Sequence, residues 1–515
     1  MIGVHLRLYA AGMSWRISSD MSKKYFHYRS LEELKQEIQE LNLAIPLEPD
    51  VEKIKAYLGR PVKIGPYIAG NSIAIHPMEG CDSTPIGQPD QLTFRRYERF
   101  GRGGAKLLWF EATAVVPEGR ANPRQLLIND YNARSLESLL VRSRNAHKEV
   151  YGTTNDLVEV LQLTHSGRYS YPLPLICHHH PVLDKVTYLD RKKGIALPED
   201  YPLLSDGYIE QMEDQFVDAA MLAREIGFKG IDLKLTHGYF GNELLGARAR
   251  PGKYGGCLEN RTRFLKNIFE KIRSAAGPDF LLSSRLGVFD GVPYVTDPET
   301  RLGRPRSFPV PYACGFGVNP DNPHEPDLAE PKEVLQIFKR LGVSLVNISM
   351  GNPYTNPHIG RPFEKPDDGN YEAPEHPLIG VDRHFRICAE LQKTFPDCVL
   401  VGTGYSWLQH FQLHAGAANI RDGNVTMMGI GRGALAYPNF ARDALIKGFL
   451  DTGSTCKTLT FCTFLMRQKD HPLGQYPTGC PPFDKEVYGT IIKEARARKS
   501  EKLLPPKGPT SVGKR

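Results

Sequence analysis

The chain has 515 residues, of which 41% are hydrophobic and 24% are charged, as in ordinary soluble globular proteins. Its formal charge of +7 is a mild excess of 65 basic over 58 acidic residues, much of it in the basic tail Lys493–Arg515, and this argues against a nucleic-acid-binding protein. No run approaches the roughly 18 apolar residues of a membrane helix, and the nine cysteines are scattered, so we expect a cytoplasmic protein without a disulfide framework.

The first residues lack the apolar core of a signal peptide. Arg7 and Arg16 precede the first acidic residue, Asp20, which leaves a weak transit peptide open, and Met21 is an alternative start.

Residues 1–64 are predicted to form a helical extension that packs on the main body. Ser30 and Glu33 have the spacing of a capping box, in which each side chain bonds the other residue's backbone N–H. The apolar residues that follow share one helix face, as expected for a short amphipathic helix: Leu31, Leu34, Ile38 and Leu41.

From about residue 70 the pattern alternates between strand and helix. Eight apolar runs predict strands at Ser72–His76, Leu107–Thr113, Leu157–Leu163, Gly230–Leu235, Phe280–Leu286, Ser344–Ser349, Val399–Thr403 and Val425–Gly429. Helical periodicity between them predicts helices that include Ala133–Val150, Ile209–Ile226, Leu258–Ala275, Pro331–Leu341, Arg383–Thr394 and Trp407–His414. Eight such units favour an α/β fold, a closed (β/α)8 TIM barrel over residues 65–450. No Gly-x-Gly-x-x-Gly opens an early helix, which argues against a dinucleotide-binding sheet.

Three connections are too long to be simple turns: His165–Asp206, Gly287–Glu330 and Gly351–Val381. Each follows a strand, so each lies on the face where barrel active sites form. We expect ordered covers because these loops contain many aromatic residues: Tyr169, Tyr171, Phe308, Tyr312, Phe316, Tyr354 and Phe363. Residues 451–515 are predicted to form an irregular, cysteine-containing segment that ends in the basic tail.

Barrels often hold a phosphate at the loops after strands seven and eight. Here those loops read Val401-Gly402-Thr403-Gly404 and Gly429-Ile430-Gly431-Arg432-Gly433. Glycines let backbone N–H groups approach an anion, and Arg432 can neutralise it. Each loop alone is equally consistent with a tight strand-to-helix turn, but the pair in these two positions favours a phosphate site.

Two polar residues stand at strand ends. The amide of Gln162 both donates and accepts hydrogen bonds, which suits the edge of a nitrogen heterocycle. The guanidinium of Arg285 is a cation that would stabilise negative charge on a reduced ring bound at this strand end. The alternatives remain open: Gln162 as a turn-capping amide, and Arg285 in a buried ion pair with Asp232 or Glu111.

The richest segment follows the fourth strand and reads Lys234-Leu235-Thr236-His237-Gly238-Tyr239. A neutral phenol at Tyr239 can donate a proton to a carbanion. Lys234 and His237 can hold and polarise a carbonyl oxygen. Taken alone, each residue is better explained by packing, with Tyr239 as a packed aromatic residue and His237 as a core histidine. Their combination at one strand end favours a catalytic role.

Together these pieces resemble the Old Yellow Enzyme (NADH:flavin oxidoreductase) family from about Gly65 to Cys480. The segments that carry the resemblance are Asn71–Met78, Glu111–Thr113 with Glu118–Arg120, Gln162–Arg168, Lys234–Tyr239, Tyr254–Gly256 with Glu259–Arg261, and Gly431-Arg432. The resemblance implies an FMN-bearing barrel that takes hydride from NAD(P)H and passes it to an activated C=C bond of a conjugated carbonyl compound.

The resemblance also assigns roles by position. Lys234 and His237 take the substrate-polarising positions, and Tyr239 takes the position of the proton donor. The implied flavin-binding residues are Pro77, Met78 and Ala112 along the ring, Gln162 and Arg285 at its polar edge, and Gly404, Gly431 and Arg432 at the phosphate. Two positions depart from the family: Lys234 stands where a histidine is usual, and Glu79 where a small polar residue or cysteine is common.

The cysteine-rich end resembles the 2,4-dienoyl-CoA reductase branch, which binds a [4Fe-4S] cluster and carries a second, nucleotide-binding module. Cys456, Cys462 and Cys480 match three ligand positions, but Leu459 stands at a fourth and cannot bind iron. We therefore do not expect the standard cluster; a different cluster, another metal or a packed tail remain alternatives. The second module is not expected in this chain, so electrons arrive directly or from a partner protein.

Other functions remain open alternatives. They are a flavin-dependent amine or demethylating dehydrogenase, a flavin-free lyase that uses Lys234 as a Schiff-base amine, and a non-catalytic flavin- or protein-binding module. We expect a small-molecule substrate and neither nucleic acid nor membrane as partner, with a homo-oligomer left open.

Overall fold

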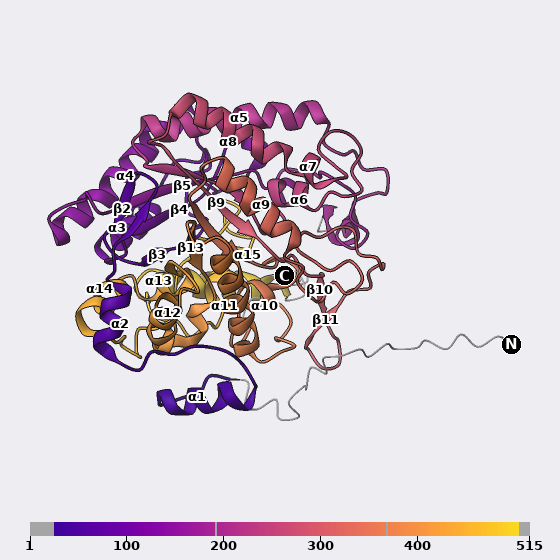
Figure 1. Cartoon of the computed structure of the whole chain (residues 1–515). Helices are drawn as coiled ribbons and strands as arrows, with labels where there is room; N and C mark the ends of the chain where they lie inside the picture. Colours follow the sequence, from indigo (N-terminus) through magenta and orange to yellow (C-terminus); the bar gives the residue numbers. More distant parts are fainter. Residues whose placement is uncertain (1–24, 191–192, 367–368, 504–515) are drawn as a thin grey trace, which may run out of the picture.

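The computed structural model describes residues 25–190, 193–366 and 369–503, and residues 1–24 with the transit-peptide prediction lie outside it. Eight parallel strands close into a barrel in the order β12-β13-β14-β3-β4-β5-β8-β9 (Figure 1). Their bounds are Ile73–Ile75 (β3), Leu107–Ala114 (β4), Val158–Thr164 (β5), Gly230–Leu235 (β8), Leu281–Gly287 (β9), Leu345–Ser349 (β12), Val399–Gly402 (β13) and Met427–Ile430 (β14). The predicted TIM barrel and its eight strands are confirmed, each strand end to within two residues.

Helices surround this barrel (Figure 1). They are Gln91–Arg102 (α3), Asp130–Tyr151 (α4), Asp206–Glu225 (α5), Phe240–Leu245 (α6), Leu258–Arg261 (α7), Arg263–Ala276 (α8), Ala329–Arg340 (α9), Pro377–Thr394 (α11), Gln412–Arg421 (α12), Arg432–Ala436 (α13) and Phe440–Lys447 (α14).

Two predicted helices are interrupted in the structure, and a third, expected over Arg383–Thr394, begins earlier, at Pro377. The helix expected over Leu258–Ala275 is divided at Thr262, whose backbone sits at φ −94° and ψ −4° and whose hydroxyl donates to the carbonyl of Leu258. The helix expected over Trp407–His414 is a 3-10 turn, Tyr405–Phe411 (η5), followed by α12, because Gln409 at φ 50° and ψ −122° interrupts helical geometry. In both places a local backbone turn overrides apolar periodicity.

Side chains on the inner face of the barrel change character along its axis. The amino-terminal layers are apolar, with Leu107 and Trp109 of β4 packed against Val158 and Val160 of β5. The hairpin of Val62–Ile64 (β1) and Tyr67–Ala69 (β2) covers that end. Towards the carboxyl ends the inward positions become polar and stay buried: His76, Glu111, Gln162, Asp232, Lys234 and Asn347. Polar groups therefore collect at the carboxyl-terminal rim.

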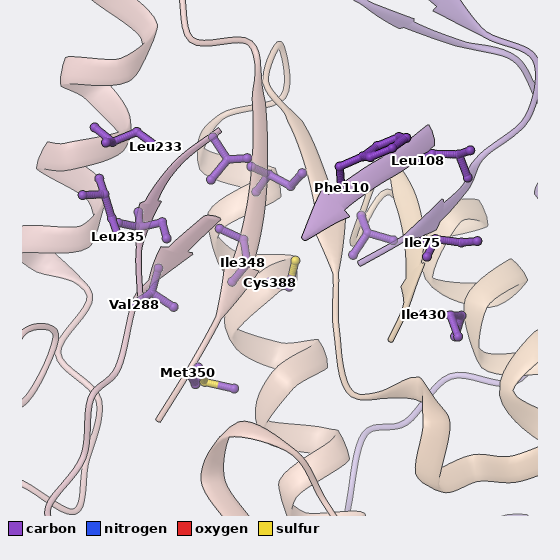
Figure 2. Packing of buried hydrophobic residues seen from close by; sticks show 14 of the residues in the cluster. Ile75, Leu108, Phe110, Leu233, Leu235, Val288, Ile348, Met350, Cys388 and Ile430 are labelled. Atoms are coloured by element: carbon purple, nitrogen blue, oxygen red, sulfur yellow. The ribbon is translucent and has the colours of Figure 1, made fainter. Parts of the chain in front are cut away.

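The alternate side chains of the same strands point outwards and pack against the helices. Figure 2 shows part of this layer, including Leu233 and Leu235 from β8, Ile348 from β12 and Cys388 from α11. A fully buried aliphatic side chain stabilises a fold by about 1.5–3 kcal/mol, so this layer holds the barrel in register.

Both ends of the described chain pack on the barrel. In the amino-terminal extension, Leu31–Glu40 (α1) and Val51–Leu58 (α2) are helical, and Glu48 forms an ion pair with Arg421 of α12. Half of the predicted capping box is present, since the Ser30 hydroxyl accepts from the N–H of Glu33 whereas Glu33 turns to the N–H of Arg29. At the other end the segment expected to be irregular contains two helices, Phe461–Arg467 (α15) and Tyr488–Leu503 (α16), which pack together.

The three long loops carry structure of their own. The first contains paired strands Tyr188–Asp190 (β6) and Ile195–Ala196 (β7), the second Tyr294–Thr296 (β10) and Gly303–Pro305 (β11), and the third the short helix Pro357–Gly360 (α10). Most of the aromatics expected to order these loops are buried or half-buried, whereas Tyr171 and Tyr354 are exposed. Across the described residues, no helix has the length and apolar character to cross a membrane.

Candidate active site

An open pocket with a cavity volume of about 180 Å³ lies at the carboxyl-terminal rim of the barrel. It extends from the loops after β13 and β14 to the loop after β8, and the third long loop and α15 also contribute to its wall. Nine of the residues predicted from the sequence to bind cofactor or substrate line it together: Pro77, Met78, Lys234, His237, Tyr239, Arg285, Gly404, Gly431 and Arg432.

Lys234, at the end of β8, is buried in the wall of this pocket beside a carboxylate. Its Nζ lies 3.3 Å from Oε1 of Glu79 and 3.7 Å from the ring centroid of Tyr239. Burial lowers the pKa of Lys234, while the charge of Glu79 opposes that change. The result is a cation held against the face of a phenol, where it can stabilise negative charge that develops on the ring or on a nearby ligand.

The chain reverses direction directly after β8. His237 and Gly238 both adopt left-handed backbone conformations, at φ 69° in each case, and Tyr239 then opens α6. Glycine is favoured at position 238, because its φ is positive and a Cβ there would lie 2.5 Å from Nδ2 of Asn352. This turn directs both His237 and Tyr239 into the pocket.

His237 and Tyr239 are both neutral in this environment. Burial, with Arg285 and Lys234 nearby, holds the pKa of His237 well below its usual range, so its imidazole is uncharged at neutral pH. Burial raises the pKa of Tyr239 well above its ordinary value, with Glu79 adding to the effect. The Tyr239 hydroxyl therefore keeps its proton, and it lies 2.9 Å from the hydroxyl of Tyr354. The site presents a proton-bearing phenol beside a neutral imidazole and a lysine.

Arg285 enters the pocket from β9, and Asp232 of β8 lies beneath it. The carboxylate accepts from Nε1 of Trp109 at 2.8 Å, from the amide of Gln162 at 2.5 Å and from the backbone N–H of Arg285 at 2.6 Å. The guanidinium forms no ion pair among the described residues, and its Nε is buried without a hydrogen-bond partner there. Burial lowers the pKa of Arg285 to about 10, so it remains charged at neutral pH.

Gln162 and Ala112 do not line the pocket. Both are buried, and the Gln162 amide donates to Asp232. Glu111, the other carboxylate considered for Arg285, is paired with Arg96. A flavin-contacting role for Gln162 and Ala112 remains a prediction.

The two glycine-rich loops meet at the opposite end of the pocket. Gly404 follows β13 in a left-handed conformation at φ 98°, and Gly431 follows β14 beside Met78, whose Sδ would lie 3.0 Å from an added Cβ. Arg432 donates to the carbonyl of Pro362 at 2.7 Å and lines the same end. The loops after the seventh and eighth strands thus form one cradle with a cation.

The three carboxyl-terminal cysteines line one small cavity that adjoins this cradle. Burial raises the pKa of the Cys456 and Cys480 thiols, and Leu459, Phe461 and Phe483 line the same space. No metal-binding set of three His, Cys, Asp or Glu residues occurs in the part of the chain that the structure describes. The three cysteines thus come together in one cavity, but Leu459 lines it at the position of a further ligand and cannot bind iron.

Sequence reasoning overlooked other residues of the pocket wall: Met350, Arg361, Ser406, Met466 and Thr478. The residues from the third long loop were identifiable in principle, because that loop follows a strand at the active face. Met466 and Thr478 belong to the segment expected to stand apart from the barrel, and no local pattern marks their position. The division of the chain at residue 450 remains a prediction.

Fold and site together define a (β/α)8 barrel whose rim carries an open pocket lined by several basic side chains. Residues 57–298, just under half of the chain, match the sequence profile of the NADH:flavin oxidoreductase / NADH oxidase family. The family consists of FMN-dependent NAD(P)H oxidoreductases of the old yellow enzyme type.

Known proteins of this kind are similar to the chain in sequence and in fold. An NADPH dehydrogenase of Clostridium acetobutylicum is 29% identical over 205 residues, which are 39% of this chain and 56% of that protein. The old yellow enzyme homologue from Zymomonas mobilis superimposes with a TM-score of 0.53 at 19% identity, covering 77% of this chain and 94% of that one. A 2-naphthoyl-CoA reductase superimposes with a TM-score of 0.61 at 16% identity, covering 86% of this chain and 58% of that one.

The chain thus spans just over half the length of the curated NADPH dehydrogenase that it matches. The structural likenesses, both below 20% identity, establish the shared barrel fold.

Proposed function

We propose that the protein is an FMN-dependent oxidoreductase that takes hydride from NAD(P)H and delivers it to an activated C=C bond of a conjugated carbonyl compound. One observation carries the proposal. A single pocket joins a glycine cradle with an arginine at one end to the Lys234, His237 and Tyr239 group at the other, with Arg285 also in its wall. The family match supports the same reading.

The residues present fit an anionic, ring-bearing cofactor. Four basic side chains and one carboxylate line the pocket: Lys234, Arg285, Arg361, Arg432 and Glu79. Gly404, Gly431 and Arg432 would hold the FMN phosphate, because glycine backbones admit an anion closely and arginine neutralises it. The buried, unsatisfied Nε of Arg285 is a donor that needs an acceptor, and Pro77 and Met78 add apolar surface for a ring.

When bound, FMN supplies the hydride transfer between NAD(P)H and the substrate. The protein's own residues do the rest. Lys234 and neutral His237 donate hydrogen bonds to the carbonyl oxygen of the substrate and draw electron density towards it. Tyr239, protonated because burial raises its pKa, gives its proton to the substrate carbon. Lys234 and Tyr239 are buried, which strengthens their electrostatic contacts.

The first test is the cofactor itself. The purified protein is expected to be yellow, to contain FMN and to bleach when NADH or NADPH is added without oxygen. Adding 2-cyclohexen-1-one should then restore the colour. A colourless protein that FMN cannot restore contradicts the proposal.

Tyr239→Phe tests the chemistry of the substrate step. Removing the proton donor is expected to slow reoxidation by the enone by about 10²-fold or more, while reduction by NAD(P)H stays unchanged. Equal reoxidation rates in the two proteins would refute the proton-donor role.

Two alternatives from the sequence call for direct comparison. Oxidation of an amine by the same flavin site would appear as flavin bleaching by amines in the absence of NAD(P)H. A Schiff-base lyase depends on the Lys234 amine, whose pKa is lowered by burial. Lys234→Arg keeps the cation but cannot form a Schiff base. A lyase with this substitution would lose all activity, and borohydride would no longer trap its substrate on the protein. A reductase would keep part of its activity.

A cytoplasmic location, a homo-oligomer and an electron-donor partner remain predictions beside this proposal. Gel filtration and reduction of the flavin by NAD(P)H alone would test the last two.

A further inference from the structure

We propose that Tyr354 is a proton relay, which returns a proton from solvent to Tyr239 after each turnover. This inference rests on the proposed function, in which Tyr239 protonates the substrate. Tyr354 comes from the third long loop, more than a hundred residues from Tyr239 in the sequence, and the two hydroxyl groups lie 2.9 Å apart.

The need for a relay follows from burial. Tyr239 is 2% exposed, whereas Tyr354 is 41% exposed. Among the described residues, Tyr354 is the only hydrogen-bond partner of the Tyr239 hydroxyl. Proton donation leaves a buried Tyr239 phenolate whose oxygen has, among the described residues, only the Tyr354 hydroxyl as a hydrogen-bond donor, and a buried anion is costly. Tyr354 lines the same pocket and is the more exposed of the two tyrosines, so we infer that this anion regains its proton through the Tyr354 hydroxyl.

The charged and imidazole side chains near Tyr239 in the described part of the chain are less well placed to do this. Lys234 lies against the face of the Tyr239 ring and is engaged with Glu79, so it stabilises the phenolate through the ring. The centroid of the His237 ring is 6.5 Å from that of Tyr239, and the low pKa of this histidine keeps it a neutral imidazole, which is a very weak acid at neutral pH. Glu79 carries negative charge towards both phenols.

The fold holds Tyr354 in place for this role. Its ring stacks on that of Tyr169 with centroids 4.2 Å apart and planes inclined by 19°. Asn352 connects the two, because its Oδ1 accepts from the N–H of Tyr354 at 2.9 Å and its Nδ2 donates to the hydroxyl of Tyr169 at 2.8 Å. Two long loops thus meet to fix a hydroxyl group beside Tyr239.

The proton count of the cycle balances. The O–H bond of Tyr239 breaks as its proton forms a C–H bond on the substrate, whose other new hydrogen arrives as hydride in the proposed reaction. The Tyr239 phenolate then takes the proton of Tyr354. The Tyr354 phenolate is reprotonated by water or a buffer acid, so one solvent proton is consumed per substrate.

The test compares Tyr354→Phe with the wild-type holoenzyme. Phenylalanine keeps the stack on Tyr169 and removes only the hydroxyl. Tyr171→Phe, in an exposed position of the first long loop, is the matched control. Stopped-flow spectroscopy follows flavin reduction by NAD(P)H and reoxidation by 2-cyclohexen-1-one in each protein, over a series of buffer concentrations.

The expected result is that Tyr354→Phe reduces at the wild-type rate but turns over about tenfold more slowly with the enone, and that small buffer acids such as imidazolium restore the rate. A packing defect would not respond to buffer acid. Wild-type turnover in Tyr354→Phe at every buffer concentration, with Tyr239→Phe still slow, overturns the relay and leaves the proposed function standing. Failure of NAD(P)H to reduce the bound flavin in the wild type overturns both.

Discussion

The buried carboxyl of Asp232 makes the stability of this protein depend on pH in a way that can be measured. Its side chain is fully buried beneath the pocket, and burial raises its pKa from 3.8 to about 6 despite three hydrogen bonds and the nearby charge of Arg285. Because the folded pKa lies above the unfolded one, the stability from this group is fully present below pH 3.8. It is lost as the pH rises through about 6.

The size of the effect follows from the shift. The interval from 3.8 to about 6 corresponds to roughly 3 kcal/mol at 1.36 kcal/mol per pKa unit. By proton linkage, about 2 kcal/mol of this falls between about pH 4.5 and about pH 7.5. Asp232→Asn removes the titration. The quantity to follow is the free energy of unfolding of the wild type minus that of the variant. We expect this difference to fall by about 2 kcal/mol between about pH 4.5 and about pH 7.5.

Urea unfolding of both proteins at several pH values measures this double difference, from which any constant cost of the substitution cancels. Ser283→Ala is the control, because Ser283 is buried on the adjacent strand β9 and does not titrate. Its difference from the wild type should stay constant with pH. An equally constant difference for Asp232→Asn would refute the reasoning.

Three further changes test the rest of the site. Gly404→Ala forces alanine to φ 98° with its Cβ 3.1 Å from His384, so we expect a loss of about 1–3 kcal/mol in urea unfolding. Arg432→Gln removes the cation of the glycine cradle, and fluorescence titration should show FMN binding weakened about tenfold or more. An unchanged affinity would mean that the phosphate lies elsewhere. Lys234→Met should slow reoxidation by the enone about 10²-fold with little effect on reduction by NAD(P)H, and equal losses in both half-reactions would contradict its role at the substrate.

Much of the fold was readable from the sequence because its signals are local. Apolar runs such as Gly230–Leu235 and Val399–Gly402 form strands since both of their faces are buried, and eight of them alternating with helices leave few closed arrangements. The loop Lys234–Tyr239 and the Gly404 and Arg432 turns could be placed for the same reason. Parallel strands in a barrel put all their carboxyl ends on one rim.

Tertiary structure alone decided how side chains from distant segments meet. Tyr354 was visible as a loop aromatic, but its hydrogen bond to Tyr239 depends on two loops folding over the rim. Asp232 was considered as a partner for the Arg285 side chain, yet it meets the backbone N–H of that residue and the amide of Gln162. Sequence periodicity fixes which face of a strand a residue occupies, whereas the pairing of side chains depends on packing between strands and loops that no local pattern encodes.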